Sequence, residues 1–233
     1  MEENQAKNKK VVIIVVAIVI VLAVAILVGI GAVINDVAQK QILSEEIEKI
    51  NQTSKVDTEI KTSGKYAEVE KVLKDYVIEY QSIAKEMQNQ YQNEKFTSIL
   101  SADNYKNDGP DFVESKKLIA DTKAKGEEVK TKLTEMGSNE YKQKRADDNG
   151  LTGKYKDLFV DSIQFEQEIK EVNSTIDSVD NYLSKIEDVF NYLTENKDSW
   201  KVNGGKVEFN QMSQVTKYNS LLTLVNIASQ KLK

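Results

Sequence analysis

The sequence predicts an all-α protein, in which one N-terminal transmembrane helix precedes an elongated bundle of three to four long helices with one small β-hairpin. Three patterns lead to this prediction: a long apolar run near the N-terminus, apolar residues at helical spacing through most of the remainder, and one pair of alternating segments around two glycines. The chain has 233 residues and 30% of them are charged, so the part beyond the apolar run has the composition of a domain in water.

The apolar run extends from Val11 to Ile34 and contains no charged residue. As a helix it is long enough to cross a hydrocarbon core of about 30 Å. Lysines are concentrated just before it, whereas the first charged residue after it is Asp36. The positive-inside rule therefore predicts residues 1–10 in the cytoplasm, a transmembrane helix at 11–34 and the rest of the chain outside the cell membrane.

A cleaved signal peptide is the alternative interpretation of this run. The apolar region of a signal peptide has about 7–15 residues and ends at a cleavage site flanked by small residues. This run is longer and is followed by no convincing site, so we expect an uncleaved anchor. Ala25 and Gly29 have a spacing that allows close approach of two membrane helices, which would permit anchors to pair.

The chain beyond the anchor is predicted to form a helical stalk or linker at 35–64 and an extracytoplasmic helical-bundle domain at 65–233. Apolar residues in the domain recur at the three- and four-residue spacing of a buried helix face. We expect helices at about 66–96, 110–136, 155–193 and 210–231, and a shorter helical segment around 139–146.

The third of these helices is predicted to be the longest, because its apolar stripe continues from Tyr155 to Leu193. Amphipathic helices of this length bury the stripe in a bundle or a coiled coil. Pro110, the chain's only proline, is expected at the first position of the second helix, where its missing N–H has no consequence.

A β-hairpin is predicted at about 199–210. Apolar and polar residues alternate on both sides of Asn203-Gly204-Gly205, a pattern typical of two strands joined by a tight turn. Because a lone hairpin is only marginally stable in water, we expect its apolar face to pack on the bundle.

The chain contains neither cysteine nor histidine. It therefore has no disulfide partner, no thiol nucleophile, and no thiolate or imidazole metal ligand. Acidic residues alternate with lysines along the predicted helices, so we interpret them as solvated faces and not as a catalytic pair, which would need a buried acid with a raised pKa. Basic residues are not clustered and the net charge is −5, so nucleic acid is not an expected partner.

Two acid-rich segments, at 103–109 and 147–150, are similar to parts of a calcium loop. The first has its glycine one place late, and the second lacks the closing glutamate. We interpret both as helix caps and turns. The sequence thus predicts no catalytic, cofactor-binding or metal-binding residue, and a protein that is not an enzyme.

Three stretches carry a resemblance to known proteins: DTEIKTSGKYAEVEKVLKDY (57–76), ILSADNYKNDGPDF (99–112) and SWKVNGGKVEFN (199–210). They resemble segments of uncharacterised single-pass membrane proteins of Gram-positive bacteria, which have a helical extracytoplasmic domain of unknown function. The resemblance implies the same topology for this chain and supplies no functional residue.

The function expected from these patterns is that of a membrane-anchored, extracytoplasmic interaction or structural protein. Its partner would be another envelope protein or a second copy of the chain. Two alternatives stay open. One is a ligand-binding or sensory ectodomain, which would act through a membrane partner because residues 1–10 are too short for an output module. The other is a carboxylate-dependent envelope hydrolase, which would need two inward-facing acids about 5–10 Å apart.

Overall fold

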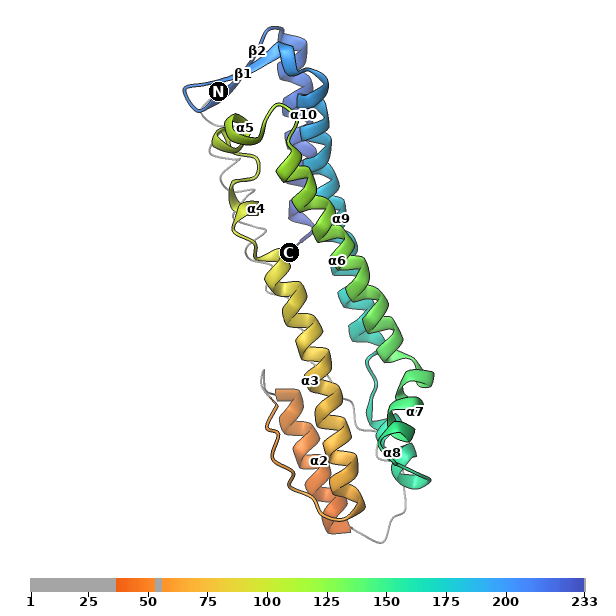
Figure 1. The fold of residues 1–233 in the computed structure, drawn as a ribbon. Coiled ribbons are helices and arrows are strands. Elements are labelled where there is room, and N and C mark those ends of the chain that lie inside the picture. Colours follow the sequence, from red (N-terminus) through yellow and green to blue (C-terminus); the bar gives the residue numbers. More distant parts are fainter. Residues whose placement is uncertain (1–36, 53–55, 233) are drawn as a thin grey trace. The chain divides into compact units, whose positions relative to one another are not determined.

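The computed structural model describes residues 37–52 and 56–232 (Figure 1). The predicted cytoplasmic segment 1–10 and transmembrane helix 11–34 lie outside the described residues. Within the described part, helices predominate and one two-stranded antiparallel sheet is present, which confirms the prediction of a helical protein with a β-hairpin. None of the described helices combines the length and the apolar character needed to cross a membrane.

The described helices follow one another along the chain, and the two strands precede the last helix. The elements are α2 (Val37–Gln52), α3 (Lys65–Tyr91), α4 (Lys95–Ser98), α5 (Ala102–Asp108), α6 (Val113–Gly137), α7 (Asn139–Asp148), α8 (Lys154–Ser162), α9 (Glu166–Glu195), the 3-10 helix η1 (Lys197–Ser199), β1 (Trp200–Asn203), β2 (Lys206–Phe209) and α10 (Met212–Gln230).

The chain divides into two compact units. Of the described residues, 86–128 and 174–232 belong to the first, called the hairpin unit because it contains β1 and β2. Residues 37–52, 56–85 and 129–173 belong to the second, called the α2 unit. The division falls within α3, α6 and α9, so each of these helices contributes residues to both units.

Aromatic side chains of α3 form the centre of the α2 unit. Tyr76 and Tyr80 lie one turn apart, and their ring centroids are 5.6 and 4.9 Å from that of Phe165. The Tyr76 hydroxyl donates to the carbonyl of Met136 at 2.6 Å, so this buried phenol has a partner near the end of α6. The spacing that predicted a helix at this position therefore also directs large rings into the core.

Residues 37–52 of the predicted stalk form α2, which lies within the α2 unit. Leu43, Ile47 and Ile50 are buried, so the apolar stripe of this helix faces protein. Glu46, on the same side of the helix, is buried with them and forms an ion pair with Lys74 of α3.

Stacked aromatic rings form the centre of the hairpin unit. The ring of Phe112 lies 4.6 Å from that of Phe190 and 6.0 Å from that of Trp200, with interplanar angles of 19° and 16°. The indole Nε1 of Trp200 donates to the carbonyl of Leu193 at 2.7 Å. Phe112 has a left-handed backbone, with φ of 55°. That conformation costs about 1–2 kcal/mol, which the burial of its ring offsets.

The predicted hairpin at 199–210 is confirmed. Strands β1 and β2 are antiparallel, with Trp200 opposite Phe209. Gly204 and Gly205 connect them with φ values of 54° and 76°, the left-handed conformation that a two-residue hairpin turn requires. The ring of Phe209 lies 5.3 Å from that of Tyr218, so the hairpin packs on α10 as expected.

The prediction of one continuous helix at 155–193 is wrong. Helix α8 ends at Ser162 and α9 begins at Glu166. Ile163 and Phe165 are each only 1% exposed, although residues two positions apart lie roughly 200° apart around a helix. A continuous helix would bring one of the two side chains to the surface, whereas the extended connection buries both.

The second predicted helix begins later than expected, at Val113, and Pro110 precedes it. The carboxylate of Asp108 explains this start, because it accepts the backbone N–H groups of Glu114 and Ser115 at 3.0 and 2.8 Å. These N–H groups belong to the first turn, where a helix has no backbone acceptors of its own.

The first predicted helix, at 66–96, ends early at Tyr91. Asn93 Oδ1 accepts the backbone N–H of Lys95 at 3.0 Å, a local hydrogen bond that competes with continuation of the helix. The remaining expectations, a short helix around 139–146 and a last helix at 210–231, are confirmed by α7 and α10.

Candidate functional site

Three charged side chains are buried together in the α2 unit. Glu46 of α2 is 3% exposed, and Glu70 and Lys74 of α3 are 1% and 2% exposed. Charged side chains are rarely buried in this way unless they are paired. The interpretation of the acidic residues as solvated faces is therefore wrong for Glu46 and Glu70. We call Glu46, Glu70 and Lys74 the buried charge cluster.

Lys74 lies at the centre of the buried charge cluster. Its Nζ is 2.7 Å from Glu70 Oε1 and 3.1 Å from Glu46 Oε2. It also donates to the backbone carbonyl of Glu59 at 2.6 Å. An ammonium group has three N–H donors, so these three acceptors engage all of them. Because Glu70 and Lys74 are four residues apart on α3, helix geometry alone places them on one face.

Glu70 holds the segment that connects α2 with α3. Its carboxylate accepts the backbone N–H groups of Lys61 and Thr62 at 3.0 and 2.8 Å. It also accepts the Thr62 hydroxyl at 2.7 Å. Together with the contact between Lys74 and the Glu59 carbonyl, these bonds fix residues 59–62 against α3.

Glu46 connects the buried charge cluster to the surface. Its Oε1 lies 2.6 Å from Nζ of Lys49, whose side chain is 66% exposed, whereas the side chain of Glu46 is 4% exposed. Its other oxygen faces Lys74. Each carboxylate in the cluster therefore has its own basic or backbone donors, and the two share one lysine.

The environment keeps both carboxylates ionised near neutral pH. Burial acts to raise the pKa of Glu46, but the hydrogen bonds from Lys49 and Lys74 outweigh it and lower the pKa below its ordinary value. Burial also acts to raise the pKa of Glu70, and the donors from Lys74, Thr62 and Lys61 lower it below the ordinary value. A general acid at neutral pH requires the opposite direction, a raised pKa. The cluster is thus built to join three segments of the chain and is poorly suited to donating a proton.

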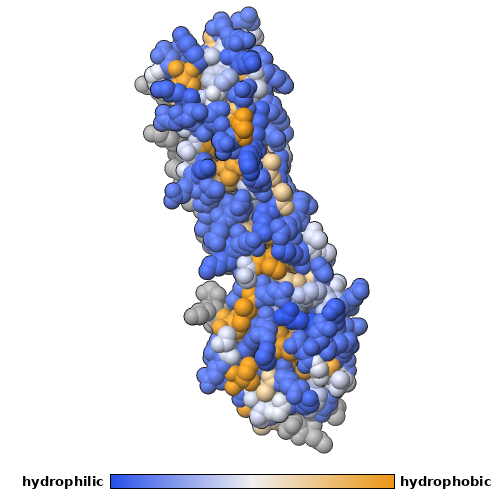
Figure 2. All heavy atoms as spheres, in the orientation of Figure 1, coloured by the Kyte–Doolittle hydropathy of each residue, from blue (hydrophilic) through white to orange (hydrophobic). Residues whose placement is uncertain are grey.

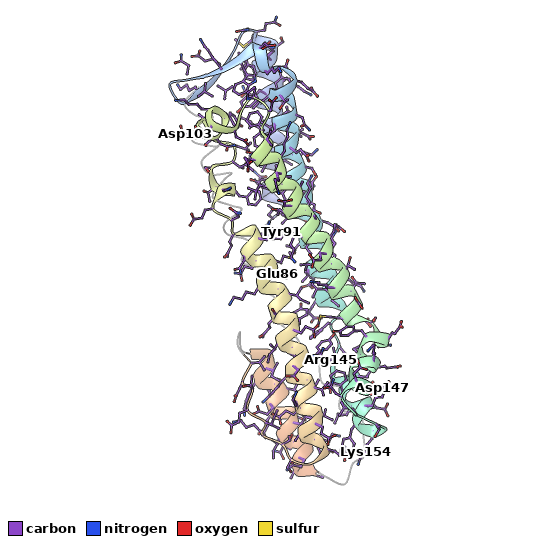
Figure 3. The ribbon with its side chains drawn as sticks, viewed as in Figure 1. Glu86, Tyr91, Asp103, Arg145, Asp147 and Lys154 are labelled. Carbon is purple, nitrogen blue, oxygen red and sulfur yellow. The ribbon has the colours of Figure 1, made fainter. Side chains whose placement is uncertain are left out.

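A second group of polar contacts attaches α7 to α3 in the same unit. Arg145, labelled in Figure 3, directs Nη1 at Oε2 of Glu79 at 2.6 Å. The hydroxyl of Tyr141 donates to the other carboxylate oxygen of Glu79 at 3.0 Å. These side chains are partly exposed, so the contact adds less to stability than a buried pair would.

Lys142 of α7 is a second buried lysine, 6% exposed. Its Nζ donates to the carbonyl of Ile163 at 3.1 Å, in the extended connection between α8 and α9. Burial lowers the pKa of its ammonium group, while the charges of Glu166 and Asp161 act to raise it. Ile163 lies outside both helices, so the ammonium group of Lys142 supplies its carbonyl with a hydrogen-bond donor that a helix would otherwise provide.

The two acid-rich segments serve local structure. Asp103, labelled in Figure 3, lies in the first turn of α5, and Asp108 at the end of that helix caps α6. Asp147 forms an ion pair with Lys156 at 2.7 Å, and Gly150 has a φ of 72° in the turn that follows α7. Across the described residues, no group of three or more acidic side chains is arranged to hold a metal ion.

Comparisons of the chain with protein-family models, with curated proteins and with solved structures gave no match. The resemblance to single-pass membrane proteins of Gram-positive bacteria therefore stays a prediction from the sequence.

The buried charge cluster was not predicted from the sequence, although the spacing of its residues on α3 carries a signal for it. On α3, Glu70 follows Tyr66 by four residues and precedes Val77 by seven, so it falls within the apolar stripe. Lys74, four residues further on, lies beside the same stripe. A pair of opposite charges at this spacing within an apolar stripe indicates a buried ion pair.

Proposed function

We propose that the protein is a membrane-anchored, extracytoplasmic interaction or structural protein that binds another envelope protein or a second copy of itself. The apolar run at 11–34 would anchor it in the cell membrane, and the lysines before that run would keep residues 1–10 in the cytoplasm. The described helices would then lie on the outer side of the membrane.

The observation that carries this proposal is the attachment of α2. Described helix α2 begins at Val37, close behind the predicted anchor that ends at Ile34. Leu43 and Ile47 bury α2 in the α2 unit, and Glu46 ties it to Lys74. Two residues, Asn35 and Asp36, separate the predicted anchor from α2, so the α2 unit would be held close to the membrane surface.

The chemistry of the described residues supports a binding or structural role over a catalytic one. Every donor of the Lys74 ammonium group is engaged, and the pKa values of Glu46 and Glu70 are lowered. The face of the molecule drawn in Figure 2 is mainly hydrophilic, with separate hydrophobic patches. Such a surface is typical of a folded domain in water that contacts its partners through limited areas.

Topology is tested with single cysteines, because the natural chain has none. Lys117→Cys places a thiol at an exposed position of α6, and Glu3→Cys places one before the predicted anchor. We expect a membrane-impermeant maleimide to label the first variant in intact cells and the second only after permeabilisation. Labelling in the reverse order, or recovery of the full chain without membranes, would overturn the proposed anchoring.

The interaction role is tested by crosslinking in cells with an amine-reactive reagent, followed by purification of the tagged full chain in detergent. The many lysines of the chain provide reactive groups. We expect at least one reproducible crosslinked species, either with another envelope protein or with a second copy. If the full chain stays uncrosslinked at every reagent concentration that crosslinks a known envelope complex in the same cells, the interaction role is wrong.

A further inference from the structure

The chain contains two Asn-Gly sequences, Asn149-Gly150 and Asn203-Gly204. In such a pair, the backbone nitrogen that follows the asparagine attacks the carbon of the side-chain amide, and glycine has no Cβ to hinder the approach. Both pairs are exposed to solvent, the first at the end of α7 and the second at the turn between β1 and β2. Exposure therefore does not distinguish them, whereas their hydrogen bonds do.

Both reacting groups of the first pair are held by α7. The backbone N–H of Gly150 donates to the carbonyl of Asp147 at 3.0 Å. The side-chain Nδ2 of Asn149 donates to the carbonyl of Arg145 at 2.8 Å. The nitrogen must turn toward the amide carbon and the amide must leave the end of the helix, so attack requires both hydrogen bonds to break.

The attacking nitrogen of the second pair is not held. Gly204 and Gly205 form the two-residue turn, with φ values of 54° and 76°. Among the described residues, no acceptor lies within hydrogen-bond reach of the N–H of Gly204. A Cβ added at Gly204 would meet no atom within 4 Å apart from its chain neighbours. Water and hydroxide therefore reach this N–H and can remove its proton.

Two contacts restrain Asn203, and both are weak. Its Nδ2 donates to Oε1 of Glu208 at 2.9 Å, and because both side chains are exposed, water competes for this hydrogen bond. Its backbone pairs with Lys206, the last pair before the turn, and this pair must open for the amide carbon to reach the nitrogen. The end of a two-stranded ribbon opens at a low free energy.

We propose that Asn203-Gly204 is a site of spontaneous deamidation and isomerisation in the folded chain. The fold protects the other pair, Asn149-Gly150, from the same reaction. The backbone nitrogen of Gly204 loses its proton to a base in the solvent and forms a bond to Cγ of Asn203. The bond from Cγ to Nδ2 breaks, and Nδ2 takes up a proton and leaves as ammonia. The product is a five-membered succinimide ring.

Water then opens the succinimide in one of two ways. Attack at Cγ gives aspartate in an unchanged main chain, and attack at the backbone carbonyl carbon gives isoaspartate, in which the main chain runs through Cγ. Over both steps one water molecule is consumed and one ammonia molecule is released. No oxidant, reductant or enzyme is required.

Either product alters the turn. A carboxylate at position 203 faces the carboxylate of Glu208 where the amide of Asn203 now donates a hydrogen bond, so an attraction becomes a repulsion between like charges. Isoaspartate also adds one carbon to the main chain at the residue that pairs with Lys206, which disturbs the register of the hairpin at its tip. The proposal does not depend on the interaction role proposed above.

The test uses the purified full chain in detergent, incubated at alkaline pH and sampled over time. Mass spectrometry of proteolytic peptides measures replacement of the amide NH2 by OH at each asparagine, and methylation by an isoaspartyl methyltransferase identifies isoaspartate. We expect Asn203 to react at least fivefold faster than Asn149, with isoaspartate among its products. The rate at Asn203 should rise with pH, because the nitrogen of Gly204 must lose its proton.

The same chain in denaturant is the matched control. Neither pair keeps its hydrogen bonds there, so we expect the two rates to converge. If Asn203 still reacts at least fivefold faster in denaturant, the neighbouring sequence selects the site and the proposal is overturned. Equal rates in the folded chain also overturn it, as does conversion of Asn203 without isoaspartate, which indicates direct hydrolysis of the amide.

Asn203→Gln tests the ring mechanism. The side chain of glutamine is one carbon longer, so attack would have to form a six-membered ring, which closes much more slowly. We expect the substitution to abolish modification at position 203 and to leave the rate at Asn149 unchanged. Deamidation of this variant at position 203 at the natural rate would overturn the proposal.

Discussion

At the scale of single residues, the buried charge cluster is the feature whose loss should destabilise the fold most. Lys74 is surrounded by two carboxylates and one carbonyl, all within 3.1 Å of its Nζ. Removing one partner from a buried ion pair leaves the other charge buried without compensation. The cluster is therefore sensitive to the loss of any member, whatever its net contribution to stability.

Lys74→Met tests this sensitivity, because methionine has a similar length and no charge. We expect the substitution to lower the free energy of unfolding by about 3–5 kcal/mol, since Glu46 and Glu70 lose their shared cation. The measurement is denaturant unfolding of the detergent-solubilised full chain. Lys117→Met, at a side chain that is 66% exposed, should change stability by less than about 0.5 kcal/mol. Equal stability of the two variants would contradict the structural role of the cluster.

The pH dependence of stability follows from the lowered pKa values of Glu46 and Glu70. The folded chain holds these protons less tightly than the unfolded chain, in which the pKa is near 4.5. The stabilisation is therefore fully present above pH 4.5 and is lost as the pH falls through the lower, folded-state pKa. We expect the unfolding midpoint to decrease below pH 4.5.

Lys74→Met provides the control for this pH dependence. Without the lysine, the pKa values of Glu46 and Glu70 in the folded chain are lowered less. The natural chain therefore loses more stability than the variant as the pH falls below 4.5, and the stability gap between the two should narrow there. Other carboxylates with lowered pKa values, such as Asp108, are present in both chains, so their effect on the pH dependence of stability cancels when the two chains are compared. A gap that stays constant from pH 7 to pH 3 would contradict the assignment.

The cluster was only partly predictable from the sequence. Glu46 follows Leu43 by three residues and precedes Ile50 by four, so its place within an apolar stripe could be read directly. The partner of Glu46 could not be predicted in this way, because Lys74 lies 28 residues away and no local pattern relates α2 to α3. Helical spacing predicts which side of a helix is buried, whereas the pairing of two sides depends on the tertiary fold.

At the scale of elements, the sequence predicted the turn of the hairpin correctly, whereas its prediction of one unbroken helix at 155–193 was wrong. The hairpin was predictable because its turn requires left-handed residues, and Gly204-Gly205 supplies them. The break between α8 and α9 was missed because the apolar stripe appeared continuous when Phe165 was left out of it. Ile163 and Phe165 are two positions apart, and one face of a helix cannot bury both of two apolar residues at that spacing.

Phe165→Ala tests whether the connection between α8 and α9 is fixed by its buried side chains. The ring of Phe165 packs on Tyr76 and Tyr80, and its loss should leave a cavity that lowers the free energy of unfolding by about 3–5 kcal/mol. Gln164→Ala, at the exposed neighbouring position, should have less than about 0.5 kcal/mol of effect. Denaturant unfolding of the full chain measures both, and similar values would show that Phe165 does not fix the connection.

At the scale of the whole molecule, the question is whether the two units unfold together. The division falls within α3, α6 and α9, and a helix is a cooperative element whose hydrogen bonds continue from turn to turn. Unfolding of one unit alone would require all three helices to end in their interiors. We therefore expect one cooperative transition for the described part of the chain.

Lys74→Met and the chain's single tryptophan allow this expectation to be tested. Lys74 belongs to the α2 unit, whereas Trp200 belongs to the hairpin unit, where its fluorescence reports the stacking on Phe112. If unfolding is cooperative, Lys74→Met lowers the denaturant midpoint measured by Trp200 fluorescence as much as the midpoint measured by far-UV circular dichroism. If the fluorescence midpoint stays at its natural value while the circular dichroism transition splits, the units unfold independently and the shared helices do not couple them.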